Sequence, residues 1–185
     1  MLQRFAPLLF LLGILVMGFG GLMLVPLTLS WVIDDGAHSA YDEAVLITVA
    51  TGALLAQLGR RHRRELRVRD SFLLVVLVWS LLPAFAALPL YFQIKGLSWT
   101  DAYFEAVSGL TATGATVLSG LDHLPLSINF WRTFLHWIGG LGVVVLAVAI
   151  LPLLGFGGRS MLKAETPGPM KDSKITPRLA ETAKG

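Results

Sequence analysis

The sequence predicts an all-α membrane protein with four transmembrane helices and one short re-entrant helix followed by a loop. Three observations support this fold class. The 185 residues have a mean hydropathy of +0.69, and only 15% of them are charged, whereas soluble domains carry about a quarter. The apolar residues form long blocks instead of following helical or strand periodicity. The segment between the last two blocks is too apolar for a solvated loop, and its uncharged stretch of 16 residues, 106–121, has the wrong length for a span.

The first predicted span covers residues 7–33, which carry no charge. The apolar region of a signal peptide is only about 7–15 residues long, so we interpret the block as a retained transmembrane helix. Gly20, Gly21 and Pro26 predict a kink or a close packing contact within it. The other predicted spans are residues 44–59, which are few for a span, 71–94, which contain Pro83 and Pro89, and 133–158.

The basic residues predict the topology. Residues 60–69 contain six arginines and one glutamate, which places this loop in the cytoplasm under the positive-inside rule. Four spans then place both termini in the cytoplasm and the acidic loop of residues 34–43 outside. The alternative role for the arginine loop is binding of anionic lipid. Residues 1–69 are predicted as an N-terminal helix pair with its basic loop, 70–158 as a helix–loop–helix repeat, and 159–185 as a cytoplasmic linker.

Residues 93–132 contain the candidate functional site. Residues 98–110 predict a short helix, which Ser98 or Thr100 caps and which Asp101 stabilises near its N-terminus. Trp99 and Tyr103 are expected at the level of the lipid headgroups. At 1.5 Å per residue, such a helix extends about 20 Å, which is enough to reach the middle of a bilayer.

The next residues, 111–116, read Thr-Ala-Thr-Gly-Ala-Thr and have weak helix propensity. Unwound backbone at mid-membrane depth is tolerated where it is buried or lines a water-filled path, and backbone carbonyls on such a path can replace the hydration shell of potassium. The alternative is a small-residue packing motif of Gly109, Ala112, Thr113 and Thr116. Residues 117–129 are expected to return irregularly to the outer surface, where Trp131 and Arg132 anchor the fourth span.

Two stretches together carry a resemblance to a known family. Residues 106–116 read Ala-Val-Ser-Gly-Leu-Thr-Ala-Thr-Gly-Ala-Thr, and residues 131–142 read Trp-Arg-Thr-Phe-Leu-His-Trp-Ile-Gly-Gly-Leu-Gly. They resemble the first pore repeat of the TrkH family, the membrane subunits of bacterial Trk potassium uptake systems in the Trk/Ktr/HKT superfamily. The resemblance implies that one quarter of a potassium selectivity filter is formed by the backbone carbonyls of Thr111, Ala112, Thr113, Gly114 and Ala115.

The resemblance also implies partners and a location. It implies the bacterial inner membrane, potassium and lipid as ligands, further pore repeats, a homodimer and a cytosolic nucleotide-binding regulatory subunit. One pore repeat is present where the family has four, so the chain is interpreted as a fragment. No cofactor, nucleic acid or enzymatic activity is expected, because no catalytic or nucleotide-binding motif is found and there is no cysteine. The competing functions are a non-conducting assembly module and a two-helix-type cation channel subunit.

The remaining polar and small residues receive structural interpretations. His136 is expected to form an interhelical hydrogen bond or to lie at an interface, and Gly139, Gly140 and Gly142 are expected to permit tight packing behind the filter. The acidic residues near the outer mouth are expected to be solvated loop or cap residues. These are Asp34, Asp35, Asp101, Glu105 and Asp122.

Overall fold

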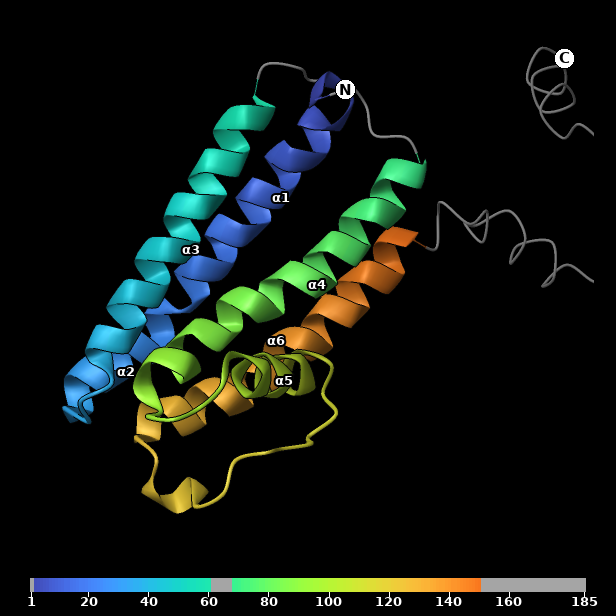
Figure 1. Ribbon diagram of the computed structural model, residues 1–185. Helices are drawn as coiled ribbons and strands as arrows, with labels where there is room; N and C mark the ends of the chain where they lie inside the picture. Colours follow the sequence, from blue (N-terminus) through green and yellow to red (C-terminus); the bar gives the residue numbers. More distant parts are fainter. Residues whose placement is uncertain (1, 61–67, 151–185) are drawn as a thin grey trace, which may run out of the picture. The chain divides into compact units, whose positions relative to one another are not determined.

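The computed structural model describes residues 2–60 and 68–150, and every regular element in these ranges is helical, which confirms the predicted all-α class (Figure 1). The chain up to Ala147 forms one compact unit, and the description below concerns that unit. The elements in chain order are α1 (Leu2–Leu22), α2 (Leu24–Ile33), α3 (His38–Gly59), α4 (Val68–Gln93), α5 (Trp99–Leu110), the 3₁₀ turn η1 (Leu121–His123) and α6 (Leu126–Ile150).

Helices α1 and α2 form one apolar span that is interrupted at Met23, as the prolines and glycines predicted. Pro26 has no N–H to donate, and its ring crowds the carbonyl group of Leu22, where α1 ends. The Met23 N–H still donates to the Phe19 carbonyl at 3.3 Å, and the Met23 carbonyl accepts from Leu27 at 3.2 Å. The span therefore continues beyond the interruption.

Helix α3 begins at His38, six residues before the predicted start, so the predicted boundary at residue 44 was wrong. The sequence prediction began the block after Asp42 and Glu43 because these residues are charged. Both side chains are exposed in the first turns of the helix, where a charged group can reach water. With 22 residues, α3 is about 33 Å long, which is sufficient to cross the hydrocarbon core of a bilayer.

Helix α3 packs against α1 at very short range because glycines line the contact. A Cβ atom at Gly13 would lie 2.4 Å from the Ala56 nitrogen, and one at Gly59 would lie 2.4 Å from the Ala6 carbonyl oxygen. A Cβ atom at Gly52 would lie 2.8 Å from the Gly13 carbonyl oxygen. Small residues that let two backbones approach are typical of helix pairs in membranes. This contact was not predicted, although the spacing of small residues in α3 indicates it.

Helix α4 contains Pro83 and Pro89, and side chains from the following elements hydrogen-bond to carbonyl groups near these residues. The Tyr103 hydroxyl donates to the Ser80 carbonyl at 3.0 Å, and the Trp131 indole N–H donates to the Ala86 carbonyl at 2.9 Å. A proline disturbs the hydrogen bonds of the turn before it, so nearby carbonyls are open to other donors. Tyr103 therefore bonds to α4, and its place at the level of the lipid headgroups stays a prediction.

Helix α6 begins at Leu126, so the prediction of an irregular chain as far as residue 129 and a helix from 133 was wrong. Its first turns are helical because they are packed: Ser127, Ile128 and Trp131 are fully buried against the N-terminal helices. The described part of α6 ends at Ile150. Three further sets of predictions lie outside the described residues: the end of the fourth span (151–158), the linker (159–185) and most of the arginine loop (61–67).

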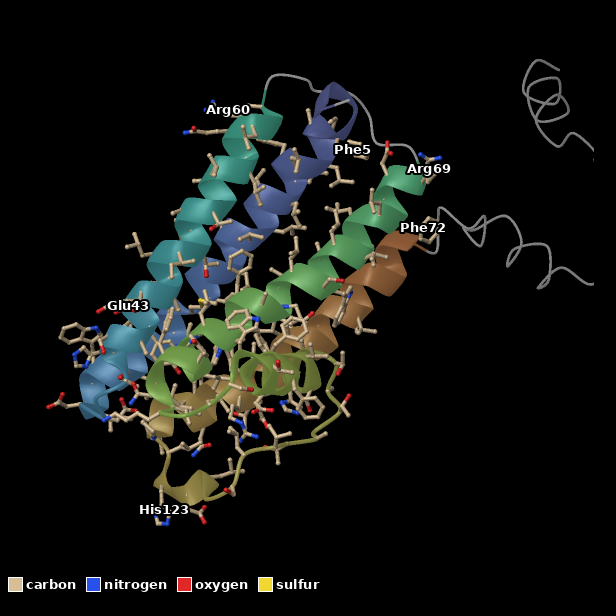
Figure 2. The ribbon with its side chains drawn as sticks, in the orientation of Figure 1. Phe5, Glu43, Arg60, Arg69, Phe72 and His123 are labelled. Atoms are coloured by element: carbon tan, nitrogen blue, oxygen red, sulfur yellow. The ribbon has the colours of Figure 1, made fainter. Side chains whose placement is uncertain are left out.

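Three helices of the described chain are long and apolar enough to cross a membrane: Phe5–Ile33, His38–Gly59 and Arg69–Gln93. Figure 2 shows Phe5, Arg60 and Arg69 at one end of the bundle and His123 at the opposite end. Helix α4 ends and α6 begins near this second end (Figure 1). The intervening chain therefore leaves and returns at the same end of the bundle, as a re-entrant segment must.

Candidate functional site

The site begins with helix α5, which starts as the sequence predicted. Ser98 has an extended conformation, and its hydroxyl oxygen accepts the Asp101 N–H at 3.1 Å. The same hydroxyl donates to the Asp101 carboxylate at 2.7 Å. These bonds satisfy one N–H group at the helix start and place a negative charge at the positive end of the helix dipole.

Helix α5 ends abruptly in a hydrogen-bonded turn. The Ala112 N–H donates to the Gly109 carbonyl and the Thr113 N–H donates to the Ser108 carbonyl, both at 2.9 Å. This pair of bonds defines a Schellman motif, which requires a left-handed residue at its centre. That residue is Ala112, with φ +54°, where glycine is the usual choice.

The turn fixes the direction of the next carbonyl groups. The N–H groups of Thr111, Ala112 and Thr113 all donate back into α5. In a trans peptide the carbonyl of one residue points opposite to the N–H of the next, and no cis peptide occurs in the described chain. The carbonyl oxygens of Thr111 and Ala112 therefore point away from α5.

Residues 111–117 form an exposed chain without helical structure, which the yellow trace in Figure 1 follows from α5 towards η1. Within the described ranges, no hydrogen bond reaches the carbonyl oxygens of Thr111, Ala112, Thr113 or Gly114. Gly114 has φ +76°, so positive φ recurs at alternate residues, 112 and 114. The unwound chain predicted for residues 111–116 is confirmed, and four consecutive carbonyl groups are free to bind a ligand.

The alternative interpretation as a small-residue packing motif holds for one of its four residues, Gly109. A Cβ atom at Gly109 would lie 2.9 Å from Leu135 Cβ, so this glycine does allow α5 to approach α6. Ala112, Thr113 and Thr116 are exposed and outside the helix, so they form no helix-packing surface within the described chain.

Two side chains of α5 hold the far end of this exposed segment. The Ser108 hydroxyl donates to the Ala115 carbonyl at 2.6 Å. One carboxylate oxygen of Glu105 accepts the Thr116 hydroxyl at 2.6 Å and the Val117 N–H at 2.7 Å. The segment is thus fixed to α5 at both ends: by the turn at residues 111–113 and by the bonds of Ser108 and Glu105 to residues 115–117.

The second carboxylate oxygen of Glu105 binds Arg132 of α6. It accepts the Arg132 Nε–H at 3.1 Å and an Nη2–H at 3.0 Å. The Glu105 side chain is only 2% exposed, so the expectation of a solvated residue was wrong, and Arg132 is not simply a surface anchor. The signal that could have identified the pair is a single glutamate in the apolar second half of α5, followed 27 residues later by a single arginine in another apolar helix.

Gly139 brings α6 against the end of α5. A Cβ atom at this position would lie 1.9 Å from the Leu110 carbonyl oxygen, so the predicted tight packing behind the site is confirmed for Gly139. It is not found at Gly140, where a Cβ atom would meet nothing within 4 Å, and at Gly142 the nearest atom, from Trp79, is 3.9 Å away. His136 Nδ1 lies 2.9 Å from the Arg132 carbonyl in its own helix, so this bond is not the expected interhelical one.

No group of three or more metal-binding side chains occurs among the described residues. The ligands that the site offers are backbone carbonyl oxygens and threonine hydroxyls. The Thr111 and Thr113 hydroxyls lie 2.8 Å from each other, and Thr111 also donates to the Val107 carbonyl. Neutral oxygen ligands without a fixed charge suit a monovalent cation that must bind and leave.

The helix pair, the re-entrant helix and the free carbonyl groups define a membrane protein with a pore-loop type of segment. The chain belongs to the TrkH family, described as cation transport proteins, whose family model matches residues 37–184. It is accordingly a member of a transport family and not of an enzyme family.

Several similar proteins are named for potassium uptake or potassium transport. The chain is 52% identical over 175 residues to the Trk system potassium uptake protein TrkH of Halomonas elongata and 48% identical over 175 residues to that of Escherichia coli K12. Both alignments cover 94% of this chain and 36% of the relative. The crystal structure of the potassium transporter TrkH from Vibrio parahaemolyticus matches with a TM-score of 0.77 and 42% identity, over 98% of this chain and 36% of that one. The chain thus spans about a third of the length of these relatives.

Proposed function

We propose that this chain takes part in potassium transport across the bacterial inner membrane as part of a Trk-type potassium uptake subunit. Thr111, Ala112, Thr113, Gly114 and Ala115 form one quarter of its selectivity filter, and their backbone carbonyls bind the ion. The observation that carries the proposal is the exposed row of carbonyl oxygens of residues 111–114, directly after the end of α5, which accept no hydrogen bond from the described residues. The Ala115 carbonyl accepts the Ser108 hydroxyl and has one lone pair left for an ion.

The physical argument is the cost of such a row in a membrane. Each unsatisfied backbone group costs several kcal/mol in hydrocarbon, so exposed carbonyls persist where they line a water-filled path or bind a ligand. The C-terminal end of α5 carries the negative end of its dipole and points at the same place, which favours a cation. A dehydrated potassium ion satisfies both conditions.

The topology and partners belong to the same proposal. The end of the bundle with Arg60 and Arg69 faces the cytoplasm, and the end with His123 faces outside (Figure 2). Residues 1–69 are the N-terminal helix pair with its basic loop, 70–158 the first pore repeat and 159–185 a cytoplasmic linker. The further partners are the remaining pore repeats, a second copy in a homodimer and a cytosolic nucleotide-binding regulatory subunit.

Alanine at Gly114 tests the filter, and the chain offers a matched control. Gly114 and Gly36 have nearly the same φ, +76° and +77°, and a Cβ atom at either would meet nothing within 4 Å. Both substitutions therefore place alanine at a positive φ that L residues rarely adopt, but only Gly114 lies in the carbonyl row. In the full reading frame that encodes this chain, we expect Gly114→Ala to abolish growth at low potassium of cells that lack other uptake systems, and Gly36→Ala to retain it. Equal growth of the two variants would exclude the filter role.

Cysteine substitution separates transport from a purely assembling role. These 185 residues contain no cysteine, so single cysteines at positions 111–116 give an unambiguous signal once any cysteine elsewhere in the full reading frame is replaced by serine. If these residues line an ion path, small external thiol reagents modify them and potassium protects them. A non-conducting assembly module instead predicts reactivity that does not depend on potassium.

A further inference from the structure

Ser127, in the first turn of α6, is held through both of its backbone polar groups by the N-terminal helix pair. Its N–H donates to the Asp35 carboxylate at 2.8 Å, and its carbonyl accepts the Tyr41 hydroxyl at 2.8 Å. Asp35 lies 92 residues earlier in the chain, in the connection between α2 and α3. Ser127 and Tyr41 are fully buried.

The start of α6 needs such a partner because it has no cap of its own. Pro125 precedes the first helical residue, Leu126, and a proline side chain has no oxygen that can accept an N–H group. A helix begins with N–H groups that lack partners within the helix, and a side-chain carboxylate is a favourable acceptor for them. Asp35 therefore accepts an N–H group at the start of α6 from a distant part of the chain. Ser98 accepts one at the start of α5 from the residue that directly precedes the helix.

The groups around residue 35 favour a carboxylate at this position. One of its oxygens accepts the Ser30 hydroxyl and the Ala37 N–H, and the other accepts the Ser127 N–H, so all three neighbours are donors. Burial alone would raise the pKa of Asp35, but hydrogen bonds from Ser30, Ser127 and Ala37 hold this pKa below its usual value. Asp35 is half-buried in the connection between α2 and α3, and its bond to the Ser127 N–H agrees with the cap-residue alternative expected for the outer acidic residues.

Helix α6 connects this contact to the candidate filter. Trp131, four residues after Ser127, contacts the Phe19 ring of α1 and donates to the Ala86 carbonyl of α4. Arg132, the next residue, binds Glu105, which holds Thr116 and Val117 at the end of the exposed carbonyl row. The position of the start of α6 thus helps to set where the exposed segment ends.

We propose that Asp35 is a positioning residue: its carboxylate caps α6 through the Ser127 N–H and so lets the N-terminal helix pair hold the pore segment in place. The transport part of this proposal rests on the proposed function. The capping part does not, and it can be measured separately.

The experiment uses Ser127→Cys as a reporter within the full reading frame and in its membrane; these 185 residues contain no cysteine, and any cysteine elsewhere in the reading frame is replaced by serine. The Ser127 side chain is fully buried, and cysteine differs from serine only by sulfur in place of oxygen, so the reporter is shielded from a membrane-impermeant maleimide. Asp35→Asn is compared with Asp34→Asn, which removes the same charge one residue away, at an exposed aspartate. Asparagine at 35 keeps one acceptor oxygen, whereas donors face both oxygens of the Asp35 carboxylate, so its amide N–H₂ group must face either Ser127 or the pair Ser30 and Ala37.

We expect Asp35→Asn to raise the maleimide reaction rate of the reporter cysteine about tenfold, as loss of a helix cap permits, and Asp34→Asn to leave the rate unchanged. Tyr41→Phe removes only the bond to the Ser127 carbonyl and should raise the rate less; this variant decides the matter if Asp35→Asn does not reach the membrane. Equal maleimide rates in the Asp35 and Asp34 variants would overturn the cap. If Asp35→Asn does not reach the membrane, an unchanged rate with Tyr41→Phe would overturn it.

The positioning role is tested by measuring potassium uptake in an Asp35→Asn variant that keeps the native Ser127. We expect a raised half-saturating potassium concentration at normal protein abundance, and an unchanged value in Asp34→Asn. A reactive reporter cysteine with unchanged uptake would refute positioning and leave the cap. If the unsubstituted protein carried no potassium, the proposed function and the positioning role would both fail, and the maleimide rates of the reporter would still decide the cap.

Discussion

Replacing Gly139 by alanine would place a methyl group against the backbone at the end of α5. The new Cβ atom would lie 1.9 Å from the Leu110 carbonyl oxygen, 2.6 Å from its carbonyl carbon and 2.9 Å from its Cα. These are backbone atoms, so no flexible side chain can move aside. Ordinary contact begins at 3.4 Å, which means that α6 and the end of α5 must separate locally by about 1.5 Å.

The magnitude follows from two opposing effects. Alanine in place of glycine inside a helix normally stabilises it by about 1 kcal/mol. Overpacking of a close contact costs about 1–3 kcal/mol and displaces the backbone that carries Thr111 and the following carbonyl groups. Gly140 supplies the matched control, because a Cβ atom there meets nothing within 4 Å and only the helix-stabilising effect remains.

Two measurements check this prediction in the full reading frame: thermal unfolding in detergent and rubidium or potassium uptake in cells that lack other uptake systems. We expect Gly139→Ala to unfold at lower temperature and to lose most of its uptake. We expect Gly140→Ala to be at least as stable as the unsubstituted protein and to retain uptake. If both variants behaved alike, the inference that close packing of α6 on Leu110 supports the carbonyl row would be refuted.

Three further predictions concern single residues. Ala112→Gly relieves a positive φ and should raise the free energy of unfolding by about 1 kcal/mol, and an unchanged or lower stability in denaturant titration would contradict the strained turn. Glu105→Gln leaves Arg132 without its carboxylate and should cost about 3 kcal/mol, whereas the exposed Glu43→Gln should change stability by less than about 0.5 kcal/mol; similar costs would argue against the buried pair. The lowered pKa of Asp35 stabilises the fold at neutral pH, and this contribution is lost as pH falls through the folded-state pKa. Melting temperature should therefore drop below about pH 4, and less steeply in Asp35→Asn; parallel curves would show that Asp35 does not contribute.

The features that could be predicted from the sequence are those whose physical cause lies within a few residues along the chain. Pro26 interrupts the first span, Ser98 caps α5, and the threonines and glycine at 111–116 end the helix, and each signal lies within a few residues of its effect. The unwound segment was therefore placed correctly along the chain, and its role as an ion site stays a prediction. Local reasoning also identified Gly139 as a packing residue, but could not distinguish it from Gly140, because that distinction depends on which helix face meets α5.

The features that sequence reasoning missed depend on distant partners. Glu105 and Arg132 are 27 residues apart, and Asp35 and Ser127 are 92 apart, so no local pattern joins them. For the same reason, Glu105 was expected to be a solvated loop or cap residue and not half of a buried ion pair. The early start of α6 has a similar origin: its first turn is stabilised by burial and by a cap from the N-terminal pair, and neither is encoded in the residues next to Pro125.

The most direct test of the central claim is to locate a heavy potassium analogue in crystals of the full-length protein that contains this chain. Rubidium or thallium gives an anomalous signal that marks the ion itself. The account predicts a peak within coordination distance of the carbonyl oxygens of residues 111–114, and its loss when excess potassium competes. Ion peaks elsewhere in the membrane, with none at these carbonyls, would contradict it.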